Sequence, residues 1–301
     1  MRKTPGVKLL NRILVATDFS VAGHRAITRA AQLAHQHEAD LQLCHATPDW
    51  SLFSRCTAAQ KQLYDEVTLH GQSAMRDEVN RVLNQFGVHA QGEVQLGRAS
   101  EVIARAIASY QPTIVVAGAR GEHEPRIAPP ALGGTALKLL LRMECPLLLV
   151  RGDDSLRYRT SLAAVQQPSD LPRRVILWST ALVPGDACHI VHAYDAPYSE
   201  RMMLCGTSDA AVQACVLTAE EVARERFDKL LSAAVSDSHA HLHLVYGNPL
   251  EVLVTEIARH NPQLLVVGRR ESERGQLPRE SSGSTALRMA YHAPIDVLVV
   301  P

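Results

Sequence analysis

The stretch GRASEVIARAIASYQPTIVVAGARG, residues 97–121, decides the fold of the chain. Its first half carries apolar residues at helical spacing, and its second half contains IVVAG, an apolar run of strand length at 114–118. A strand this short and this apolar is typical of a parallel sheet that is covered on both faces. The same order of helix and strand returns 150 residues later in GNPLEVLVTEIARHNPQLLVVGRRE, residues 247–271.

The repeat extends beyond this stretch. Identical residues coincide at the same offset: Gly97 with Gly247, Glu101 with Glu251, Val102 with Val252, Ile107 with Ile257, Pro112 with Pro262 and Gly118 with Gly268. So many coincidences at one offset indicate a duplicated domain. The charged segment at 150–159 separates the copies, and we predict one domain at 1–152 and a second at 153–301.

Each copy contains five apolar runs of strand length, and helical patterns alternate with them. The runs lie at 12–17, 41–47, 89–95, 113–118 and 146–151 in the first copy, and at 161–165, 189–194, 240–247, 263–268 and 296–300 in the second. Strands that alternate with helices form right-handed crossovers. We therefore predict an α/β fold of two tandem, doubly wound, Rossmann-like domains, each with a five-stranded parallel sheet.

Composition restricts the class of protein. The 301 residues include 31 basic and 31 acidic residues, so the formal net charge is zero and no broad positive field for nucleic acid is expected. No apolar run has the length of a membrane span, and the N-terminus lacks the cleavage site of a secretory signal, so we expect a cytoplasmic protein. The six cysteines form no CxxC pair, which favours reduced thiols.

The loop after residues 114–118 has the glycines of a phosphate-binding loop. Gly118 ends the strand, and Gly133 and Gly134 open the next helix. Glycines let a backbone approach a ligand closely, and the N–H groups at a helix N-terminus attract anions. In a doubly wound sheet such a loop lies at the carboxyl ends of the strands, where ligands bind. Plain turns and helix starts also use glycines, so the pattern alone leaves a structural role open.

Three stretches carry a family resemblance: RILVATDFS at 12–20, LGRASEVIARAIASYQPTIVVAGARG at 96–121 and LGGTALKLLLRMECPLLLV at 132–150. The chain resembles the universal stress protein family, and in particular its tandem two-domain members. The resemblance covers nearly the whole chain and implies an adenine nucleotide alpha hydrolase-like fold. ATP-binding members of that family carry the pattern Gly-x2-Gly-x9-Gly followed by Ser or Thr.

The resemblance implies a site for ATP or another adenine nucleotide in the first domain, with magnesium arriving only on the nucleotide. It assigns Ala16, Thr17, Asp18 and Ala46 to the nucleoside, and Gly118, Gly121, Gly133, Gly134 and Thr135 to the phosphates. Two features depart from the family pattern. Eleven residues rather than nine separate the second and third glycines, and Gly134 stands where a Ser or Thr hydroxyl is expected.

The second domain departs further from the pattern. Gln166 occupies the position of Asp18, and Glu271 replaces the second loop glycine. The residues of the pattern that remain are Gly268, Gly283, Ser284 and Thr285. Because a carboxylate repels a triphosphate, we predict a degenerate site that has lost the family's mode of ATP binding. The arginine-rich loop around it either holds another anion or is simply solvated.

Histidines recur in HAHLHLVYG, which places His239, His241 and His243 on one face of a strand. Three imidazoles at this spacing suit zinc or copper, but an exposed strand face is the simpler interpretation, and we expect no metal site. His45 and His192 lie at equivalent positions in the two copies, which favours packing or a wall of the crevice. The chain has no motif of a serine hydrolase, P-loop enzyme or metalloprotease, so we assign no catalytic residue and expect at most slow ATP hydrolysis.

Three functions stay open. The leading hypothesis is a stress-response binding or regulatory protein with an adenine-nucleotide site in the first domain. The second is a scaffold that has lost both nucleotide sites and binds protein partners or another small ligand. The third is a metal-dependent hydrolase that uses the histidines. The resemblance also implies that the last strands, at 146–151 and 296–301, pair antiparallel about a pseudo-two-fold axis, and it leaves a homodimer of whole chains open; no nucleic acid or membrane partner is expected.

Overall fold

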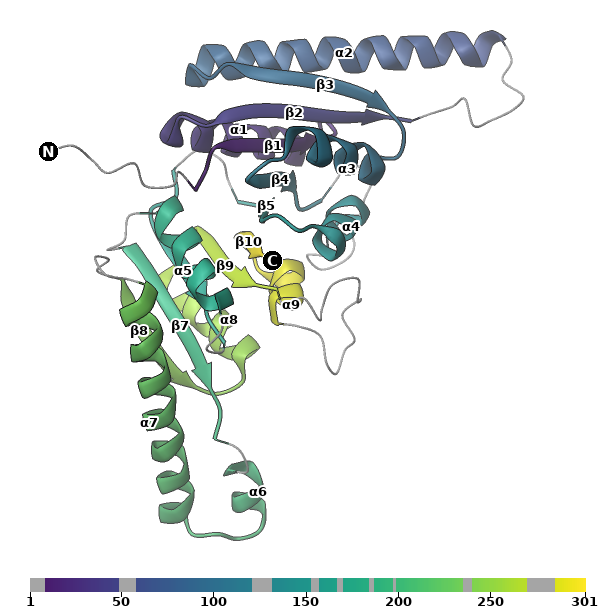
Figure 1. The fold of residues 1–301 in the computed structure, drawn as a ribbon. Helices are drawn as coiled ribbons and strands as arrows, with labels where there is room; N and C mark the ends of the chain where they lie inside the picture. The colour runs from purple at the N-terminus through teal and green to yellow at the C-terminus, as the bar shows by residue number, and fades with distance from the viewer. Residues whose placement is uncertain are drawn as a thin grey trace, which may run out of the picture. The chain divides into compact units, whose positions relative to one another are not determined.

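The computed structural model of the chain describes residues 9–48, 58–120, 132–152, 157–166, 170–183, 187–196, 199–234, 240–269 and 285–301. The chain forms two compact units, Met1–Arg157 and Tyr158–Pro301 (Figure 1). The sequence places the boundary a few residues earlier, between 152 and 153, in the same charged segment. Each unit is an α/β fold with a parallel sheet, as the repeat predicts.

The first unit is built on five strands whose neighbouring pairs are all parallel. The strands are β1 (Arg12–Thr17), β2 (Asp40–Thr47), β3 (Ala90–Leu96), β4 (Ile114–Gly118) and β5 (Leu147–Val150), in the order β3-β2-β1-β4-β5. The middle of β1, Ile13 to Val15, is 0% exposed. Because helices cover both faces of the sheet, the central strands are apolar without the alternation of a half-exposed strand.

Helices cover the first sheet in two layers. On one face, α1 (Val21–His37) packs against β1 and β4, and α2 (Ala58–Phe86) packs against β2 and β3. On the other face, α3 (Ala99–Tyr110) packs against β1 and β2, and α4 (Gly134–Arg142) packs against β5. The chain therefore leaves β1 toward one face and β4 toward the other, and this divergence opens a crevice between two neighbouring strands.

The second unit repeats this arrangement strand for strand. Its strands are β6 (Ser161–Ala164), β7 (Cys188–Tyr194), β8 (His241–Tyr246), β9 (Leu264–Gly268) and β10 (Asp296–Val300), and their order β8-β7-β6-β9-β10 matches the order in the first unit. All neighbouring pairs within the unit are parallel. The equivalence of the two orders confirms the two tandem α/β domains that the repeat predicts.

The helices of the second unit follow the same plan. One face carries α5 (Asp170–Leu182) and α7 (Asp209–Ala234), with the short α6 (Ser199–Leu204) beside α7. The other face carries α8 (Pro249–His260) against β7 and α9 (Thr285–His292) against β10. In Figure 1, α7 is the long green helix beside β7 and β8.

Sequence periodicity locates every strand to within one residue at each end, but it misses the two longest helices. α2 has 29 residues and α7 has 26. Their apolar residues are not confined to one stripe: Leu69 on α2 is 64% exposed and Leu217 on α7 is 57% exposed. A helix with apolar residues on its solvent side shows a weak 3.6-residue period, which explains why the pattern did not reveal it.

The turn from β1 into α1 is fixed by side-chain hydrogen bonds. Phe19 adopts a left-handed conformation with φ 59°, and its N–H donates to Thr17 Oγ1 at 3.0 Å. Ser20 is the N-cap of α1: its Oγ accepts from the N–H of Gly23 at 3.1 Å and donates to Asp18 Oδ1 at 2.5 Å. The cap therefore also holds the carboxylate of Asp18 at the end of β1.

Replacing Ser20 with alanine should lower the free energy of unfolding of the first unit by about 1 kcal/mol, because an N-cap hydroxyl is lost. Urea denaturation followed by circular dichroism measures the change. Ser109→Ala is the control, since that exposed hydroxyl bonds only to the carbonyl of Ala106 within α3, at 3.2 Å. Its effect should stay within about 0.5 kcal/mol, and equal losses in both variants would contradict the capping role.

Candidate functional site

A cavity of about 400 Å³ lies in the first unit at the carboxyl ends of β1 and β4. Its walls come from the ends of β1, β2 and β4 and from the starts of α1, α3 and α4. This is the crevice that the divergence of the two central strands opens. Its volume lies in the range of about 300–1,000 Å³ that is typical of small-molecule sites.

Eight of the nine residues that the sequence assigns to the nucleotide line this one cavity. They are Ala16, Thr17, Asp18, Ala46, Gly118, Gly133, Gly134 and Thr135. The ninth, Gly121, lies outside the described residues. The fold thus brings together residues that are up to 119 positions apart, from 16 to 135, at one end of one sheet.

The β1 side of the crevice is held in place by hydrogen bonds. Asp18 Oδ1 accepts from the N–H of Ser20 at 3.1 Å and from its hydroxyl, so the carboxylate has a fixed orientation although the residue is exposed. The ring of His45 lies within hydrogen-bonding distance of the end of β1, with Nδ1 2.9 Å from the carbonyl oxygen of Thr17. This contact holds the ring of His45 against the end of β1, in agreement with a packing role.

The α4 side of the crevice is a helix start without a side-chain cap. Gly133 is the N-cap of α4 and makes no side-chain capping bond, while its N–H donates to the carbonyl of Ala119 at 2.8 Å. A Cβ on Gly134 would meet nothing within 4 Å, so this glycine is not required by packing. The hydroxyl that the family pattern has at this position would therefore fit here.

Gly118 is a glycine for a different reason from the one that the loop pattern suggests. The glycines with positive φ among the described residues are Gly87, Gly97, Gly206 and Gly247, so Gly118 does not use the left-handed region. A Cβ on Gly118 would lie 3.1 Å from the backbone of Ala22. Close contact between the end of β4 and the start of α1, rather than a special backbone angle, requires this glycine.

Two cations of the crevice were not foreseen as site residues. Arg120 and Lys138 both line the cavity beside the glycines. Lys138 lies four residues after Gly134, which places it on the same face of α4 as the helix start. This spacing is visible in the sequence and could have identified Lys138. Positive side chains next to exposed helix N–H groups give this end of the cavity the charge that suits an anion.

Cys44 forms part of the cavity wall on β2. The residue is 1% exposed, and burial, with a smaller contribution from the charge of Glu93, raises the pKa of its thiol to about 12. The thiol is therefore protonated at neutral pH and behaves as a small apolar side chain. It contributes shape to the crevice rather than nucleophilic chemistry.

At the corresponding place in the second unit, two of the chain's own side chains bond to each other. Gln166, at the position of Asp18, donates from Nε2 to Thr285 Oγ1 at 2.7 Å. Leu171 lies against Gly268 as Ala22 lies against Gly118 in the first unit, and its Cγ would be 2.7 Å from a Cβ on Gly268. The loop residues Glu271, Gly283 and Ser284 lie outside the described residues.

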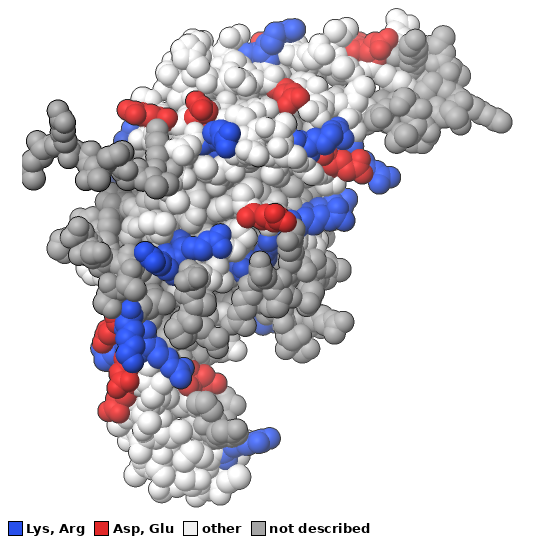
Figure 2. All heavy atoms as spheres, in the orientation of Figure 1, with Lys and Arg blue, Asp and Glu red and all other residues white. Residues whose placement is uncertain are grey.

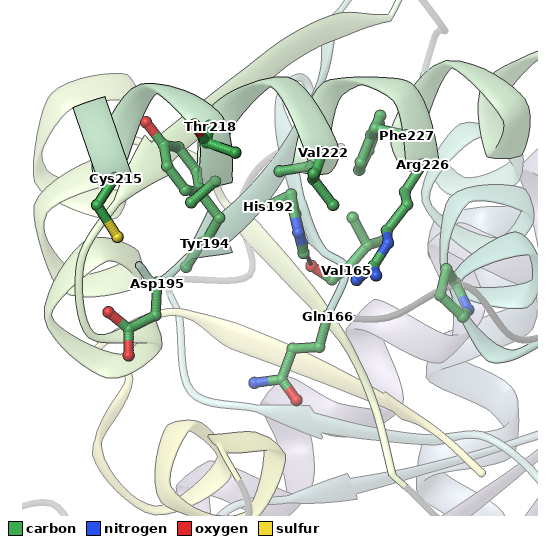
Figure 3. A pocket seen from close by; sticks show the side chains of 14 residues that line it. Val165, Gln166, His192, Tyr194, Asp195, Cys215, Thr218, Val222, Arg226 and Phe227 are labelled. Atoms are coloured by element: carbon green, nitrogen blue, oxygen red, sulfur yellow. Dashed lines mark hydrogen bonds between the residues drawn. The ribbon is translucent and has the colours of Figure 1, made fainter. Parts of the chain in front are cut away.

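A second cavity of about 680 Å³ lies in the second unit between α7 and the ends of β6 and β7 (Figure 3). Its lining is Val165, Gln166, Pro172, His192, Ala193, Tyr194, Asp195, Cys215, Thr218, Ala219, Val222, Ala223, Arg226 and Phe227. Figure 3 shows Asp195 and Arg226 toward opposite ends of the cavity. Half of these residues come from α7, a helix that the sequence pattern did not reveal, so the cavity was not predicted.

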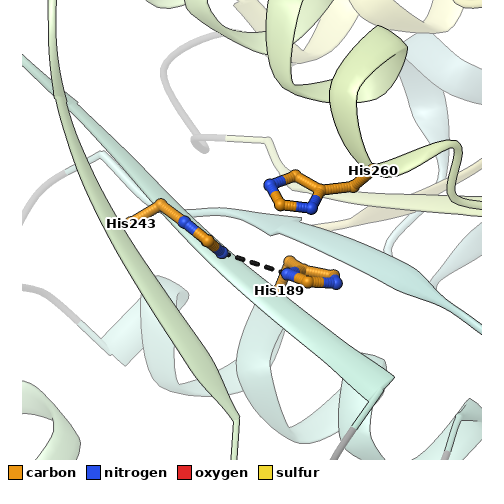
Figure 4. A group of neighbouring side chains, drawn as sticks. All are labelled: His189, His243 and His260. Carbon is orange, nitrogen blue, oxygen red and sulfur yellow. Dashed lines mark hydrogen bonds between the residues drawn. The ribbon is translucent and has the colours of Figure 1, made fainter.

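A cluster of three histidines lies between β7, β8 and α8, on the face of the second sheet that α8 covers (Figure 4). It joins His189 of β7, His243 of β8 and His260 of α8. Of the three histidines that the sequence places on one strand face, His243 belongs to the cluster, His241 is exposed beside it, and His239 lies outside the described residues. Sequence spacing could not supply His189 and His260, because they come from other elements.

The described surface carries both signs of charge. On the face drawn in Figure 2, blue basic and red acidic side chains are interspersed. Among the helices of the described ranges, none combines the length and the apolar composition needed to cross a bilayer.

Comparisons with known proteins agree with the fold. The model of the Universal stress protein family matches residues 10–151 and again residues 160–301. A universal stress protein from Archaeoglobus fulgidus DSM 4304 has a similar structure, with TM-score 0.67 and 16% identity over 96% of this chain and 98% of that chain. A putative universal stress protein from Pseudomonas aeruginosa UCBPP-PA14 has TM-score 0.62 and 15% identity over 97% of this chain and 93% of that chain. No match to a curated protein was found.

The raised pKa of Cys44 leads to a prediction about alkylation. In the folded protein at pH 8, iodoacetamide should modify the exposed Cys205 and leave Cys44 unmodified, because alkylation needs an accessible thiolate. Peptide mass spectrometry measures both sites, and the same reaction in guanidinium chloride, where both thiols are accessible, is the control. Equal rates at the two sites in the folded protein would show that the wall of the crevice is open to solvent.

Proposed function

The chain belongs to the universal stress protein family, with two tandem copies of the family's domain, and we propose that its first domain binds ATP or another adenine nucleotide. The observation that carries this proposal is the single cavity at the ends of β1 and β4, which gathers the eight described residues of the family's nucleotide pattern. Through that site the protein acts as a binding or regulatory component of a stress response rather than as an enzyme.

The two ends of the cavity suit the two ends of a nucleotide. At the nucleoside end, the carboxylate of Asp18 offers an acceptor for the ribose hydroxyls, and its orientation is set by Ser20. At the other end, Lys138 and Arg120 flank the start of α4, where phosphate oxygens are stabilised by N–H groups and by positive charge. Magnesium would arrive with the phosphates, since the described lining has one carboxylate, that of Asp18.

The second domain serves a different purpose in this proposal. The hydrogen bond between Gln166 and Thr285 joins the residues that would face the nucleoside and the phosphates. Bound nucleotide would have to break this hydrogen bond. We therefore assign one nucleotide to each chain, in the first domain.

Binding without rapid turnover fits the chemistry of the crevice. The one carboxylate of its described lining, that of Asp18, is held by Ser20 at the nucleoside end, and the one thiol, that of Cys44, has its pKa raised to about 12 by burial. General base catalysis requires a deprotonated group within reach of the attacking water at the phosphate end. Any hydrolysis of bound ATP is therefore expected to be slow.

Isothermal titration calorimetry with ATP on the full chain tests the site. Lys138→Ala should weaken binding about fivefold, the effect of losing roughly 1 kcal/mol from a partly solvated contact to phosphate. Gly134→Ser should strengthen binding by a similar factor, because the hydroxyl restores about one net hydrogen bond in space that the structure leaves open.

Arg142→Ala is the matched control for these titrations. It removes the same charge one turn further along α4, where the side chain does not line the cavity, and the affinity should stay within twofold. Absence of binding in the wild-type protein would refute the nucleotide proposal. Identical affinities in all four proteins would place the nucleotide elsewhere.

The cavity of about 680 Å³ in the second unit favours a second candidate function, the binding of another small ligand. Its walls are mainly apolar, with Phe227 and Val222 from α7, and they carry Arg226 and Asp195 as charged groups. A mainly apolar pocket with few polar groups is the usual form of a site for an amphipathic small molecule. This site and the nucleotide crevice are in different domains, so the two functions are compatible.

The dye 1-anilinonaphthalene-8-sulfonate is a suitable probe, since it combines apolar rings with one negative charge. Wild-type protein should increase its fluorescence, and Ala219→Trp should abolish most of this increase because the indole fills the cavity. Ala214→Trp is the control: it adds the same ring to an exposed position on α7 that does not line the cavity. Equal fluorescence with both variants would exclude this cavity as the dye site.

The proposal also covers the cellular compartment of the protein and its oligomeric state. Five cysteines in the described residues, Cys44, Cys145, Cys188, Cys205 and Cys215, are free thiols, which supports a reducing compartment such as the cytoplasm. Pairing of the two domains through their last strands, and dimerisation of whole chains, stay predictions. Light scattering on the purified protein distinguishes a monomer from a dimer.

A further inference from the structure

The three histidines of the second unit lie together (Figure 4), with the ring of His260 stacked on that of His189. One ligand nitrogen from each ring lies within 4.8 Å of the other two. His189 Nδ1 is 3.0 Å from His243 Nε2, and the ring centroid of His260 is 4.0 Å from that of His189 and 4.7 Å from that of His243. Three elements that are distant in sequence thus contribute to one group of nitrogens.

These separations are close to those of a metal site. Zinc–nitrogen bonds of about 2.0–2.1 Å in a tetrahedron place ligand nitrogens about 3.3 Å apart. The hydrogen-bonded pair at 3.0 Å is slightly closer than this, and the other pairs are within 4.8 Å. Rotation of the His260 ring out of its stack on His189, with smaller shifts of the other two rings, would bring all three nitrogens to coordination distance, with the ion in place of the proton that His189 and His243 share.

A buried carboxylate orients the third ligand. Glu256 is 3% exposed, and its Oε2 lies 3.0 Å from Nε2 of His260, one turn further along α8. Metal-bound histidines commonly donate their second N–H to a carboxylate, which fixes the ring and makes it a better ligand. This bond leaves Nδ1 of His260 to face the ion. The other charged group beside Glu256 is the exposed Arg259, whose nitrogen is 3.7 Å away.

The first unit provides an internal comparison, because the same fold carries other residues at these positions. Gln42 pairs with Gln91 in the first unit as His189 pairs with His241 in the second, so Gln42 occupies the position of His189. By the same register Glu93 corresponds to His243, and Gln42 Nε2 donates to Glu93 Oε2 at 3.0 Å. Tyr110, the last residue of α3, corresponds to His260. The first unit therefore has a Gln–Glu hydrogen bond where the second unit has the histidine cluster.

We propose that His189, His243 and His260 form a zinc site at the amino-terminal ends of β7 and β8, with a water molecule as the fourth ligand. Imidazole nitrogens suit zinc among the divalent ions, and three protein ligands leave one position open. The ion ties α8 to two strands, so it stabilises the second unit. The site lies toward the amino-terminal ends of the strands, whereas the cavities lie at the carboxyl ends. It does not depend on nucleotide binding.

The test uses the full chain without a polyhistidine tag, dialysed against a chelator that is then removed. Titration with Zn²⁺ against a chromogenic chelator should give one ion per chain, and Co²⁺ should give the strong visible absorption of a tetrahedral site. His243→Asn should weaken zinc binding at least 100-fold, and Glu256→Gln should weaken it about 10–100-fold because the ring of His260 loses its anchor. His292→Asn, an exposed histidine at the end of α9, is the matched control and should leave the affinity unchanged.

A second measurement on the wild-type protein keeps the test decisive if a variant fails to fold. Zinc should protect His189, His243 and His260 from modification by diethyl pyrocarbonate, mapped by mass spectrometry, and should leave His292 reactive. Failure of the wild-type protein to bind Zn²⁺, absence of protection at the three histidines, or unchanged affinity in folded His243→Asn would overturn the proposal.

Discussion

Burial of parallel strands on both faces is the constraint on which the rest of this structure depends. Strands such as β1, with Ile13 to Val15 at 0% exposure, have no room for functional polar groups along their length. Backbone hydrogen bonds between parallel neighbours satisfy the strands internally, so chemistry must come from strand ends and flanking helices. The crevice of the first unit and the cavity of the second lie at the carboxyl ends of the strands, and the histidine cluster lies nearer the amino ends of β7 and β8.

Duplication lets one fold carry different chemistry in its two copies. At the end of the first strand, the first unit has Asp18, whereas the second has Gln166, which donates a hydrogen bond to Thr285. On the two outer strands the second unit has the more specialised residues: a Gln–Glu hydrogen bond between β2 and β3 in the first unit corresponds to a pair of imidazoles between β7 and β8 in the second. Because strand register is the same in both copies, each exchange changes a site without changing the sheet.

The sequence predicts the fold well because buried strands and the repeat are local patterns. Residues near the glycine loop, and Asp18 after β1, were located because they match a known pattern position by position. The cavity under α7 and the pair His189 and His260 were not, since their parts are brought together only by the tertiary fold. Gly118 lines the crevice, but the reason for a glycine there, its close contact with Ala22, depends on the packing of two elements and cannot be read from the sequence.

The ring of His192 has a consequence for the cavity that it lines. Its Nδ1 lies 2.8 Å from the carbonyl oxygen of Val165, and since a carbonyl can only accept, this nitrogen must carry the hydrogen. In the neutral ring Nε2 is then a bare acceptor, so the backbone selects one tautomer. His45 is held in the same way by Thr17 in the first unit. A ligand that reaches the His192 ring must therefore present a hydrogen-bond donor, and molecules that offer only lone pairs there are disfavoured.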